Sequence, residues 1–399
     1  MPDRPGKPRR SVGIVTVARS DFGYYLPVLR RAMKDPALEV RLYASGMHLS
    51  PEFGMTVGMI EENGFRIDES IPLPLDSDSP ECIARAMAAG IQGFGALFAR
   101  RKPDILVVLG DRFDMYPAAV AALPFKLPVV HICGGELSEG AIDDALRHSM
   151  TKLSHLHLVE TTGYARRVIQ LGEEPWRVKV VGNPSLDNLR SMRLLSVREM
   201  SARVGFDFSR PFLLVTFHST TLEFDQAGVQ VAALLAALEG ARMPVLFTMP
   251  NADTGGRVIA ERIRQYVAAH PDAKLVDNLG TELYFSAMAL AAAMVGNSSS
   301  GIVEAASFKL PVINVGNRQK GRPRPANVID VGYRTGAIRT GLSKALRPAF
   351  RRSLRGLTNP FGDGKAAGRI VRALAVPLGE QLLHKRFHDL PSTRKAGIR

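Results

Sequence analysis

Polar residues that can act as acids, bases and anion ligands follow successive apolar runs between residues 104 and 152. The run 105–109 ends in Gly110-Asp111-Arg112, and the run 129–132 ends in Cys133-Gly134-Gly135-Glu136. A third cluster, Asp143-Asp144 with Arg147-His148, opens a helical segment. In open parallel sheets, ligands bind at the carboxyl ends of the strands. Glycine pairs also punctuate ordinary turns, but this succession favours a site.

The most specific motif of the second half is Gly296-Asn297-Ser298-Ser299-Ser300-Gly301, which leads directly into a helix. Free N–H groups and the helix dipole favour a phosphate at such an end. Ser298, Ser299 and Gly301 are therefore candidate phosphate ligands, and Glu304 could meet a ribose. A plain serine helix cap is the alternative. Three serines between two glycines favour the anion site.

Further polar residues follow other apolar runs of the second half. His218 comes after the run 212–217, and Asn251 and Asp253 come after the run 245–249. Arg318 and Arg322 follow a later strand and are candidate phosphate ligands or surface charges. These residues extend the predicted site to the second half of the chain.

The first strand, 11–17, is followed by a loop with Arg19 and Gly23 but without the G-x-G-x-x-G pattern of dinucleotide-binding domains. Arg19 could hold an anion or a base, or could simply be solvated in the loop. His48 follows the strand 39–44 and could donate to a phosphate or be an ordinary loop histidine. A helix is expected over 51–64.

Strands and helices alternate through both halves, which is typical of doubly wound sheets. Charge rises and strands are lost between the two runs of alternation. We therefore expect an α/β protein with two Rossmann-like domains that face each other across a cleft. The expected divisions are a basic tail over 1–10, a first domain over 11–185, a connection over 186–210, a second domain with closing helices over 211–380, and a basic tail over 381–399.

The chain of 399 residues carries a formal net charge of +14, which raises the possibility of nucleic-acid binding. The first ten residues hold four basic residues against one acidic, and 385–399 hold five against one, so half of the excess lies in two ends expected to fray. No nucleic-acid-binding motif lies between them. A polyanionic small substrate or a plain basic surface explains the remainder.

Only two cysteines, Cys82 and Cys133, are present, so at most one disulfide can form and a reducing cytoplasm is expected. The basic start lacks the apolar core of a signal peptide. The apolar segment 285–295 is too short to span a bilayer. We expect a cytoplasmic protein with no membrane partner.

Taken together, these motifs resemble the UDP-N-acetylglucosamine 2-epimerases, and specifically the hydrolysing branch that serves sialic- and legionaminic-acid-type biosynthesis. The resemblance covers residues 11–378, essentially the whole folded part. It implies the GT-B architecture, a UDP-sugar substrate, and assembly as a homodimer or a dimer of dimers. It implies neither a metal nor another cofactor, because the reaction needs no hydride carrier.

The resemblance also implies a reaction. The hydrolysing enzymes eliminate UDP across C1–C2 of the sugar to form a glycal, then add water with inversion at C2, which releases an N-acetylmannosamine-type product. Carboxylates and a histidine can supply the acids and bases. By motif position the catalytic or substrate-polarising residues are Asp111, Asp143 and His218. The residues implied around the nucleotide are Arg19, Gly23, Arg112, Asn251, Ser298, Ser299, Glu304 and Arg318.

One departure from the family pattern is important. Well-studied hydrolysing members carry a catalytic glutamate two residues after the histidine of the second strand, whereas this chain reads His131-Ile132-Cys133. A thiol matches a carboxylate's charge only if its pKa is strongly depressed. Glu136 is the candidate replacement. The departure favours a different UDP-sugar, such as a 2,4-diacetamido-2,4,6-trideoxyhexose, or a displaced carboxylate, over reduced activity.

Two other readings remain open from the sequence. A GT-B glycosyltransferase would share the fold and transfer its sugar to an acceptor without epimerisation. A nucleotide-sugar-binding protein with an altered catalytic centre would bind UDP without turnover.

Overall fold

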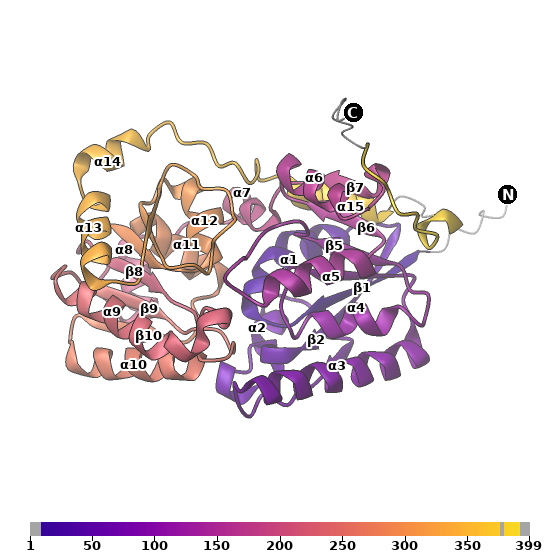
Figure 1. The fold of residues 1–399 in the computed structure, drawn as a ribbon, viewed down its shortest axis with the longest axis horizontal. Helices are drawn as coiled ribbons and strands as arrows, with labels where there is room; N and C mark the ends of the chain where they lie inside the picture. Colours follow the sequence, from indigo (N-terminus) through magenta and orange to yellow (C-terminus); the bar gives the residue numbers. More distant parts are fainter. Residues whose placement is uncertain (1–8, 376–378, 392–399) are drawn as a thin grey trace, which may run out of the picture.

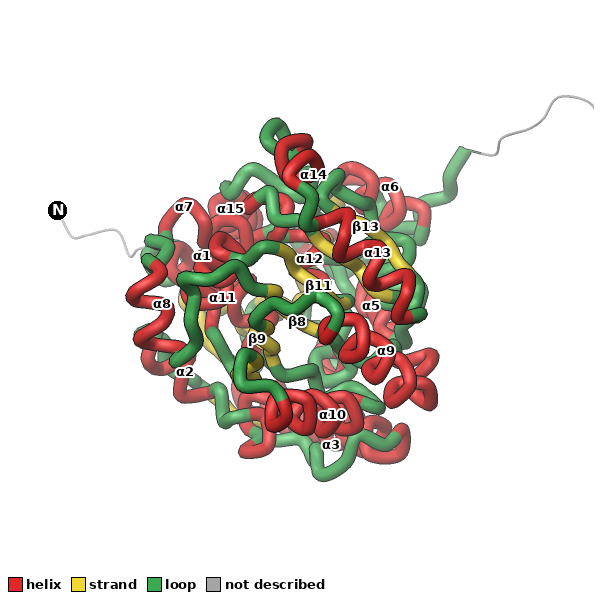
Figure 2. The backbone as a smooth tube through the Cα atoms, turned by 90° about the vertical axis from the view of Figure 1, so that its left-hand side faces the viewer, coloured by secondary structure: helices red, strands yellow, loops and turns green. Residues whose placement is uncertain are grey.

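The protein contains two parallel β-sheets with helices packed around them, placed side by side along the long axis of the molecule (Figure 1). The structure is a computed structural model that describes residues 9–375 and 379–391. A view along the long axis shows strands surrounded by helices (Figure 2). The expectation of an α/β protein with two Rossmann-like sheets is confirmed.

The first sheet has the order β3-β2-β1-β4-β5-β6-β7. The order reverses direction between β1 and β4, which is the switch point where doubly wound sheets bind ligands. Its strands are β1 (Arg10–Thr16), β2 (Leu38–Ser45), β3 (Glu69–Ile71), β4 (Ile105–Leu109), β5 (Val129–Ile132), β6 (Leu156–Val159) and β7 (Val178–Val180).

The second sheet repeats this topology with the order β10-β9-β8-β11-β12-β13, so its switch point lies between β8 and β11. Its strands are β8 (Leu213–Thr216), β9 (Val245–Thr248), β10 (Ala273–Val276), β11 (Ala293–Gly296), β12 (Val312–Val315) and β13 (Val328–Val331).

Helices connect the strands of each sheet and continue beyond them. Those before the second sheet are α1 (Arg19–Ala32), α2 (Val57–Glu62), α3 (Pro80–Arg101), α4 (Tyr116–Ala122), α5 (Asp143–Leu153), α6 (Thr162–Gln170), α7 (Asn188–Ser191) and α8 (Val197–Val204). Those after its first strand are α9 (Ala227–Glu239), α10 (Gly256–Ala269), α11 (Gly280–Leu290), α12 (Ser299–Val303), α13 (Thr335–Ala345), α14 (Pro348–Ser353) and α15 (Ala366–Ala375).

Central strands are buried on both faces, which explains why their sequences are continuous apolar runs. All five residues of β4 and all four of β5 are buried. Parallel pairing of Leu106 with Val129 and of Val130 with Leu156 aligns β4, β5 and β6. The polar residues that follow these strands are thereby brought to one edge of the sheet.

Two local expectations differ from the structure. The helix expected over 51–64 is interrupted: a 3₁₀ turn over Pro51–Phe53 is followed by α2. Gly54 and Met55, with φ values of 84° and 46°, adopt left-handed conformations that a continuing helix cannot contain. The short strand β3 was not expected, because three residues give too short an alternation to recognise.

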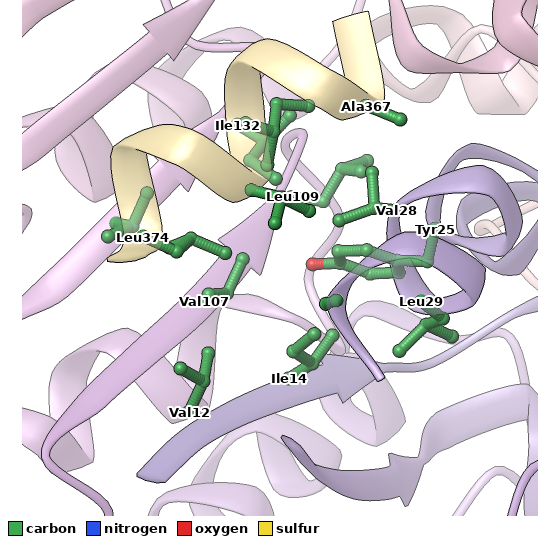
Figure 3. Packing of buried hydrophobic residues seen from close by; sticks show 14 of the residues in the cluster. Val12, Ile14, Tyr25, Val28, Leu29, Val107, Leu109, Ile132, Ala367 and Leu374 are labelled. Atoms are coloured by element: carbon green, nitrogen blue, oxygen red, sulfur yellow. The ribbon is translucent and has the colours of Figure 1, made fainter. Parts of the chain in front are cut away.

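Helix α15 packs on the first sheet, although the expected division assigns it to the second domain. Ile370, Val371 and Leu374 belong to the same buried cluster as Val12 and Val107. Figure 3 shows Leu374 and Ala367 of this helix beside Val107, Leu109 and Ile132. The chain therefore returns to its first half to cover one face of that sheet. A closing helix was expected in this part of the chain, but the sequence could not specify which sheet it would cover.

The described end of the chain is also bound to the first half, although a frayed tail was expected over 381–399. The Arg177 guanidinium donates to the carbonyls of Gln381 at 3.1 Å, Leu382 at 2.8 Å and His384 at 3.0 Å. Lys385 Nζ pairs with the buried Glu173 at 2.8 Å. These contacts hold the segment as far as Lys385, and residues 1–8 and 392–399 of the two tails lie outside the described part.

Helix α3 is, by length and composition, apolar enough to cross a membrane. Its Phe94, Leu97 and Phe98 are buried in a core cluster with Leu106 and Val108 of the first sheet. An apolar helix that packs on a sheet in this way serves as a core helix of the fold.

The packing of α15 predicts a stability effect in the first half of the protein. Ile370→Ala should lower the free energy of unfolding by about 2–5 kcal/mol, because it leaves a cavity under the sheet. Arg372→Ala, on the exposed side of the same helix, should change it by no more than about 0.5 kcal/mol. Denaturant unfolding measures both, and equal effects would contradict this packing.

Candidate functional site

A pocket of about 230 Å³ lies between the carboxyl edges of the two sheets. The first half contributes loops after β1, β4 and β5 and the start of α5, and the second half contributes loops after β8, β9, β11 and β12 and the start of α11. Of the residues selected from the sequence, the pocket wall includes Arg19, Gly23, Asp111, Arg112, Asp143, His218, Asn251, Ser298, Ser299, Glu304 and Arg318.

Asp111 is held in place by Arg147, a buried guanidinium from α5. Arg147 Nη2 hydrogen bonds to Asp111 Oδ2, and Nη1 donates to the carbonyl of Cys133 at 2.7 Å. Nη1 also lies 3.4 Å from Glu136 Oε2. One arginine thus connects the loops after β4 and β5. The sequence placed Arg147 in a charged cluster but did not identify this role.

Asp143 is the first residue of α5 and lines the pocket. Burial, together with the negative charges of Asp111 and Asp253, raises the pKa of Asp143 to about 7. A carboxyl group with this pKa can both accept and donate a proton near neutral pH.

His218 is a neutral imidazole with one nitrogen already engaged. Burial, followed by the charges of Arg318, Arg19 and Arg112, lowers the pKa of His218 well below its usual value. Its Nδ1 accepts a hydrogen bond from the backbone N–H of Asn251 at 3.1 Å. The proton of the neutral ring is therefore assigned to Nε2, which can donate to a ligand in the pocket.

Two arginines meet at Asp253, between the halves of the site. Arg112 binds Asp114 through Nε at 2.9 Å, and its Nη1 lies 3.6 Å from Asp253 Oδ1. Arg318 Nη2 lies 3.8 Å from Asp253 Oδ2. Asp253 is not part of the main pocket wall and instead lines a small cavity of about 10 Å³ beside Asp143. Its contacts orient cations that face the pocket.

The serine motif forms the start of α12. Ser298 Oγ accepts from the Ser300 backbone N–H at 3.3 Å, so it caps the helix as the alternative interpretation expected, and it also lines the pocket. Glu304 accepts from Ser185 Oγ at 2.6 Å. Gly301 does not line the pocket: a Cβ at this position would lie 2.9 Å from Val312 Cγ1, so the glycine permits close packing.

Arg19 reaches from the first half to the second. Its Nη2 donates to the Met249 carbonyl at 3.1 Å, and its Nη1 hydrogen bonds to the Asp277 carbonyl. Gly23 lies one turn further along α1, and a Cβ there would lie 3.2 Å from Thr281 Oγ1. The start of α1 therefore faces the start of α11 across the pocket.

Three selected residues lie behind the pocket wall. His48 is buried between Thr16 Oγ1 at 2.9 Å and Thr56 Oγ1 at 2.8 Å, and burial lowers its pKa to about 3. Cys133 is buried, and burial followed by Glu160 and Glu136 raises the pKa of its thiol well above the usual value. Glu136 pairs with Arg322, whose guanidinium does line the pocket.

The sequence interpretation missed a group of residues on the pocket wall that includes the start of α11. These are Ser20, Tyr24, Met59, Ser138, Ala141, Ser185, Asn278, Leu279, Gly280, Thr281, Tyr284 and Phe285. The Asn278–Gly280 turn between β10 and α11 was the available signal, since it has the same strand–loop–helix position as the selected motifs.

Comparison with known proteins identifies the family to which this chain belongs. The family model described as UDP-N-acetylglucosamine 2-epimerase matches residues 30–375. The chain belongs to the UDP-N-acetylglucosamine 2-epimerase family. Among its relatives is the UDP-N,N'-diacetylbacillosamine 2-epimerase (hydrolyzing) of Legionella pneumophila, 37% identical over 94% of this chain and 98% of the relative. Another is the GDP/UDP-N,N'-diacetylbacillosamine 2-epimerase (hydrolyzing) of Campylobacter jejuni, 36% identical over 96% of this chain and 100% of the relative.

The fold is also shared with a solved 2-epimerase. The structure of Methanocaldococcus jannaschii UDP-GlcNAc 2-epimerase in complex with UDP-GlcNAc and UDP matches with a TM-score of 0.77 at 18% identity, over 92% of this chain and 100% of that chain. The likeness confirms the expected GT-B architecture. The recognition of the epimerase family from its strand-end motifs is confirmed by the family match and the two relatives.

The environment of Asp143 predicts its titration. In the ligand-free protein its carboxyl group should titrate near pH 7, because burial and neighbouring carboxylates disfavour its ionised form. In an Asp111→Asn variant the midpoint should move to lower pH, since one negative charge is removed. Carbon-13 NMR of aspartate-labelled protein measures this shift, and an unchanged midpoint would show that Asp111 does not act on Asp143.

Proposed function

We propose that this protein is a hydrolysing UDP-sugar 2-epimerase whose substrate is a UDP-2,4-diacetamido-2,4,6-trideoxyhexose of the N,N'-diacetylbacillosamine type. The observation that carries the reaction is the meeting of Asp111, Asp143 and a neutral His218 in one pocket between the two sheets. The names of the two relatives support the choice of sugar over UDP-N-acetylglucosamine. No cofactor takes part in the proposed reaction.

The proposed reaction has two stages. First, a base removes the proton from C2 of the sugar while UDP leaves C1, which forms a glycal with a C1–C2 double bond. Water then adds, its hydroxyl to C1 and a proton to C2 from the opposite face, which inverts C2 and releases the free sugar. Asp143 can exchange a proton in both stages because its pKa lies near 7.

The remaining residues of the pocket fit the proposed nucleotide. Arg112 and Arg318 would neutralise the pyrophosphate, Ser298 and Ser299 would donate to a phosphate, and Glu304 would accept from the ribose. The Nε2–H of His218 would donate to a substrate oxygen. Arg19, Gly23 and Asn251 would complete the nucleotide site.

We also propose that this enzyme is cytoplasmic and serves sialic- or legionaminic-type sugar biosynthesis. It assembles as a homodimer or homotetramer. Both cysteines are free and buried, which suits a reducing compartment. Analytical ultracentrifugation measures the assembly, and a monomer at all concentrations would contradict it.

An NMR time course in D2O, without added metal or nucleotide cofactor, tests the function. With UDP-N,N'-diacetylbacillosamine we expect free UDP and a C2-inverted sugar that carries deuterium at C2, faster than with UDP-N-acetylglucosamine. A UDP-linked C2 epimer without free sugar would indicate the non-hydrolysing reaction. Transfer to an acceptor without epimerisation would indicate a glycosyltransferase, and UDP binding without turnover would indicate a binding protein.

Two substitutions test the proposed catalytic carboxyl groups. Asp111→Asn and Asp143→Asn should each lower kcat by about 10²–10⁴-fold, because an amide cannot exchange the proton. Calorimetric UDP binding should persist in both variants. Asp225→Asn, at an exposed position of the 3₁₀ helix Thr221–Gln226, is the matched control and should keep full turnover. Unchanged kcat in either site variant would remove that residue from the mechanism.

A further inference from the structure

Glu160 is a buried carboxyl group that no motif of the sequence singled out. It follows β6 directly, its exposed fraction is 3%, and it lies beside two groups that follow β5. One carboxylate oxygen of Glu160, one of Glu136 and the Sγ atom of Cys133 all lie within 4.8 Å of one another. Two carboxyl groups and a thiol therefore share one buried space behind the pocket wall.

The cations near this space are already committed to other carboxylates. Arg322, from the second half of the chain, binds Glu136 with Nη2 at 2.7 Å from Oε2. Arg147 contacts Glu136 and pairs with Asp111. Among the described residues, Glu160 forms no ion pair. If it were ionised, it would be a buried charge without a counterion next to another carboxylate, which is strongly unfavourable.

The hydrogen bonds of Glu160 place a proton on one particular oxygen. Asn183 Nδ2 donates to Oε1 at 2.5 Å, so Oε1 acts as an acceptor. Oε2 has no donor partner, and an ionised group would leave it unsatisfied. A proton on Oε2 would let this oxygen donate to the neighbouring Glu136 carboxylate, which lies in the same cluster of atoms within 4.8 Å of one another. Burial, followed by the charge of Glu136, raises the pKa of Glu160 well above its usual value.

We propose that Glu160 is a neutral carboxylic acid in the working enzyme and a positioning residue for the site. Its O–H group fixes Glu136, which in turn holds Arg322 at the pocket wall and Arg147 on Asp111. An ionised Glu160 would compete for both arginines. The catalytic consequence rests on the proposed function, whereas the protonation state does not.

Other occupants and other titrating groups fit this space less well. A thiol and two carboxylates could chelate a metal ion, but the two guanidinium groups on Glu136 already supply the positive charge. Tyr24 of α1 and Tyr164 of α6 also face the cluster, and burial raises the pKa of both phenols. Burial also raises the pKa of the Cys133 thiol, the third titratable neighbour of Glu160.

The first test is the pH dependence of stability in Glu160→Gln. Because the pKa of Glu160 is raised in the folded state, its contribution is fully present at low pH and is lost as the pH rises above the usual carboxyl range. Glutamine cannot ionise, so the ratio of wild-type to variant unfolding constants should rise by about tenfold per pH unit there. The exposed Glu62→Gln is the control and should track wild type. An identical pH dependence in Glu160→Gln would overturn the proposal.

Turnover of Glu160 variants distinguishes a neutral hydrogen-bond donor at this position from an ionised carboxylate. Glu160→Gln keeps a donor and should leave kcat/KM within about twofold of wild type and extend activity to higher pH. Glu160→Leu removes the donor and should lower kcat/KM by about 10–100-fold, since the lost hydrogen bond is made to a charged group. If Glu160→Asp retained activity while Glu160→Gln was as impaired as Glu160→Leu, an ionised carboxylate would be required and the proposal would be wrong.

Infrared spectroscopy detects the proton on the Glu160 carboxyl group without requiring turnover. With carbon-13 label at the glutamate side-chain carboxyls, wild type at neutral pH should show a protonated-carboxyl band that Glu160→Gln weakens. If that variant does not fold, the labelled wild type alone still decides, because a complete absence of the band overturns the proposal. Failure of every UDP-sugar to react would reject the proposed function, while the stability and infrared tests of Glu160 would remain valid.

Discussion

The arrangement of the site depends on the ion pairs and the hydrogen bond that the buried guanidinium of Arg147 makes. It joins Asp111 after β4 to the Cys133 carbonyl and Glu136 after β5, and it projects from the helix that begins with Asp143. Removing one partner of such a buried pair leaves a charge that neither water nor another group compensates. The position of the reacting carboxylates is thus set by the balance of charges around them as much as by the sheet.

That balance extends across both halves of the protein. Arg322 comes from the loop after β12 but binds Glu136 of the first half, and Arg19 comes from α1 but binds carbonyls of the second half. Asp253, in the second half, likewise contacts Arg112 of the first half. Each half alone would lose some of the partners of its charged groups. The complete electrostatic environment therefore exists only when the two sheets face each other.

The sequence predicted what depends on local pattern. Apolar runs and the residues after them located both sheets and most of the pocket wall, because parallel strands align their ends at one edge. It did not predict that α15 covers the first sheet or that Arg177 binds the end of the chain, since these contacts join residues that are more than two hundred positions apart in the sequence. His48 and Gly301 carried the right strand-end signal, yet packing turned them away from the pocket.

Cys133 shows why a motif departure needs its surroundings to be understood. In the sequence, the thiol stands for a missing carboxylate. In the structure it lies behind the pocket wall, beside Glu160 and Glu136. Among the described residues, Glu136 pairs with Arg322 and Arg147, and Arg147 is also paired with Asp111. A glutamate at this position would add a third carboxyl group to a buried space that cannot neutralise it. A neutral thiol beside Glu160 is compatible with the charges present, so the departure fits a site whose carboxylates are arranged differently rather than one that has lost its chemistry.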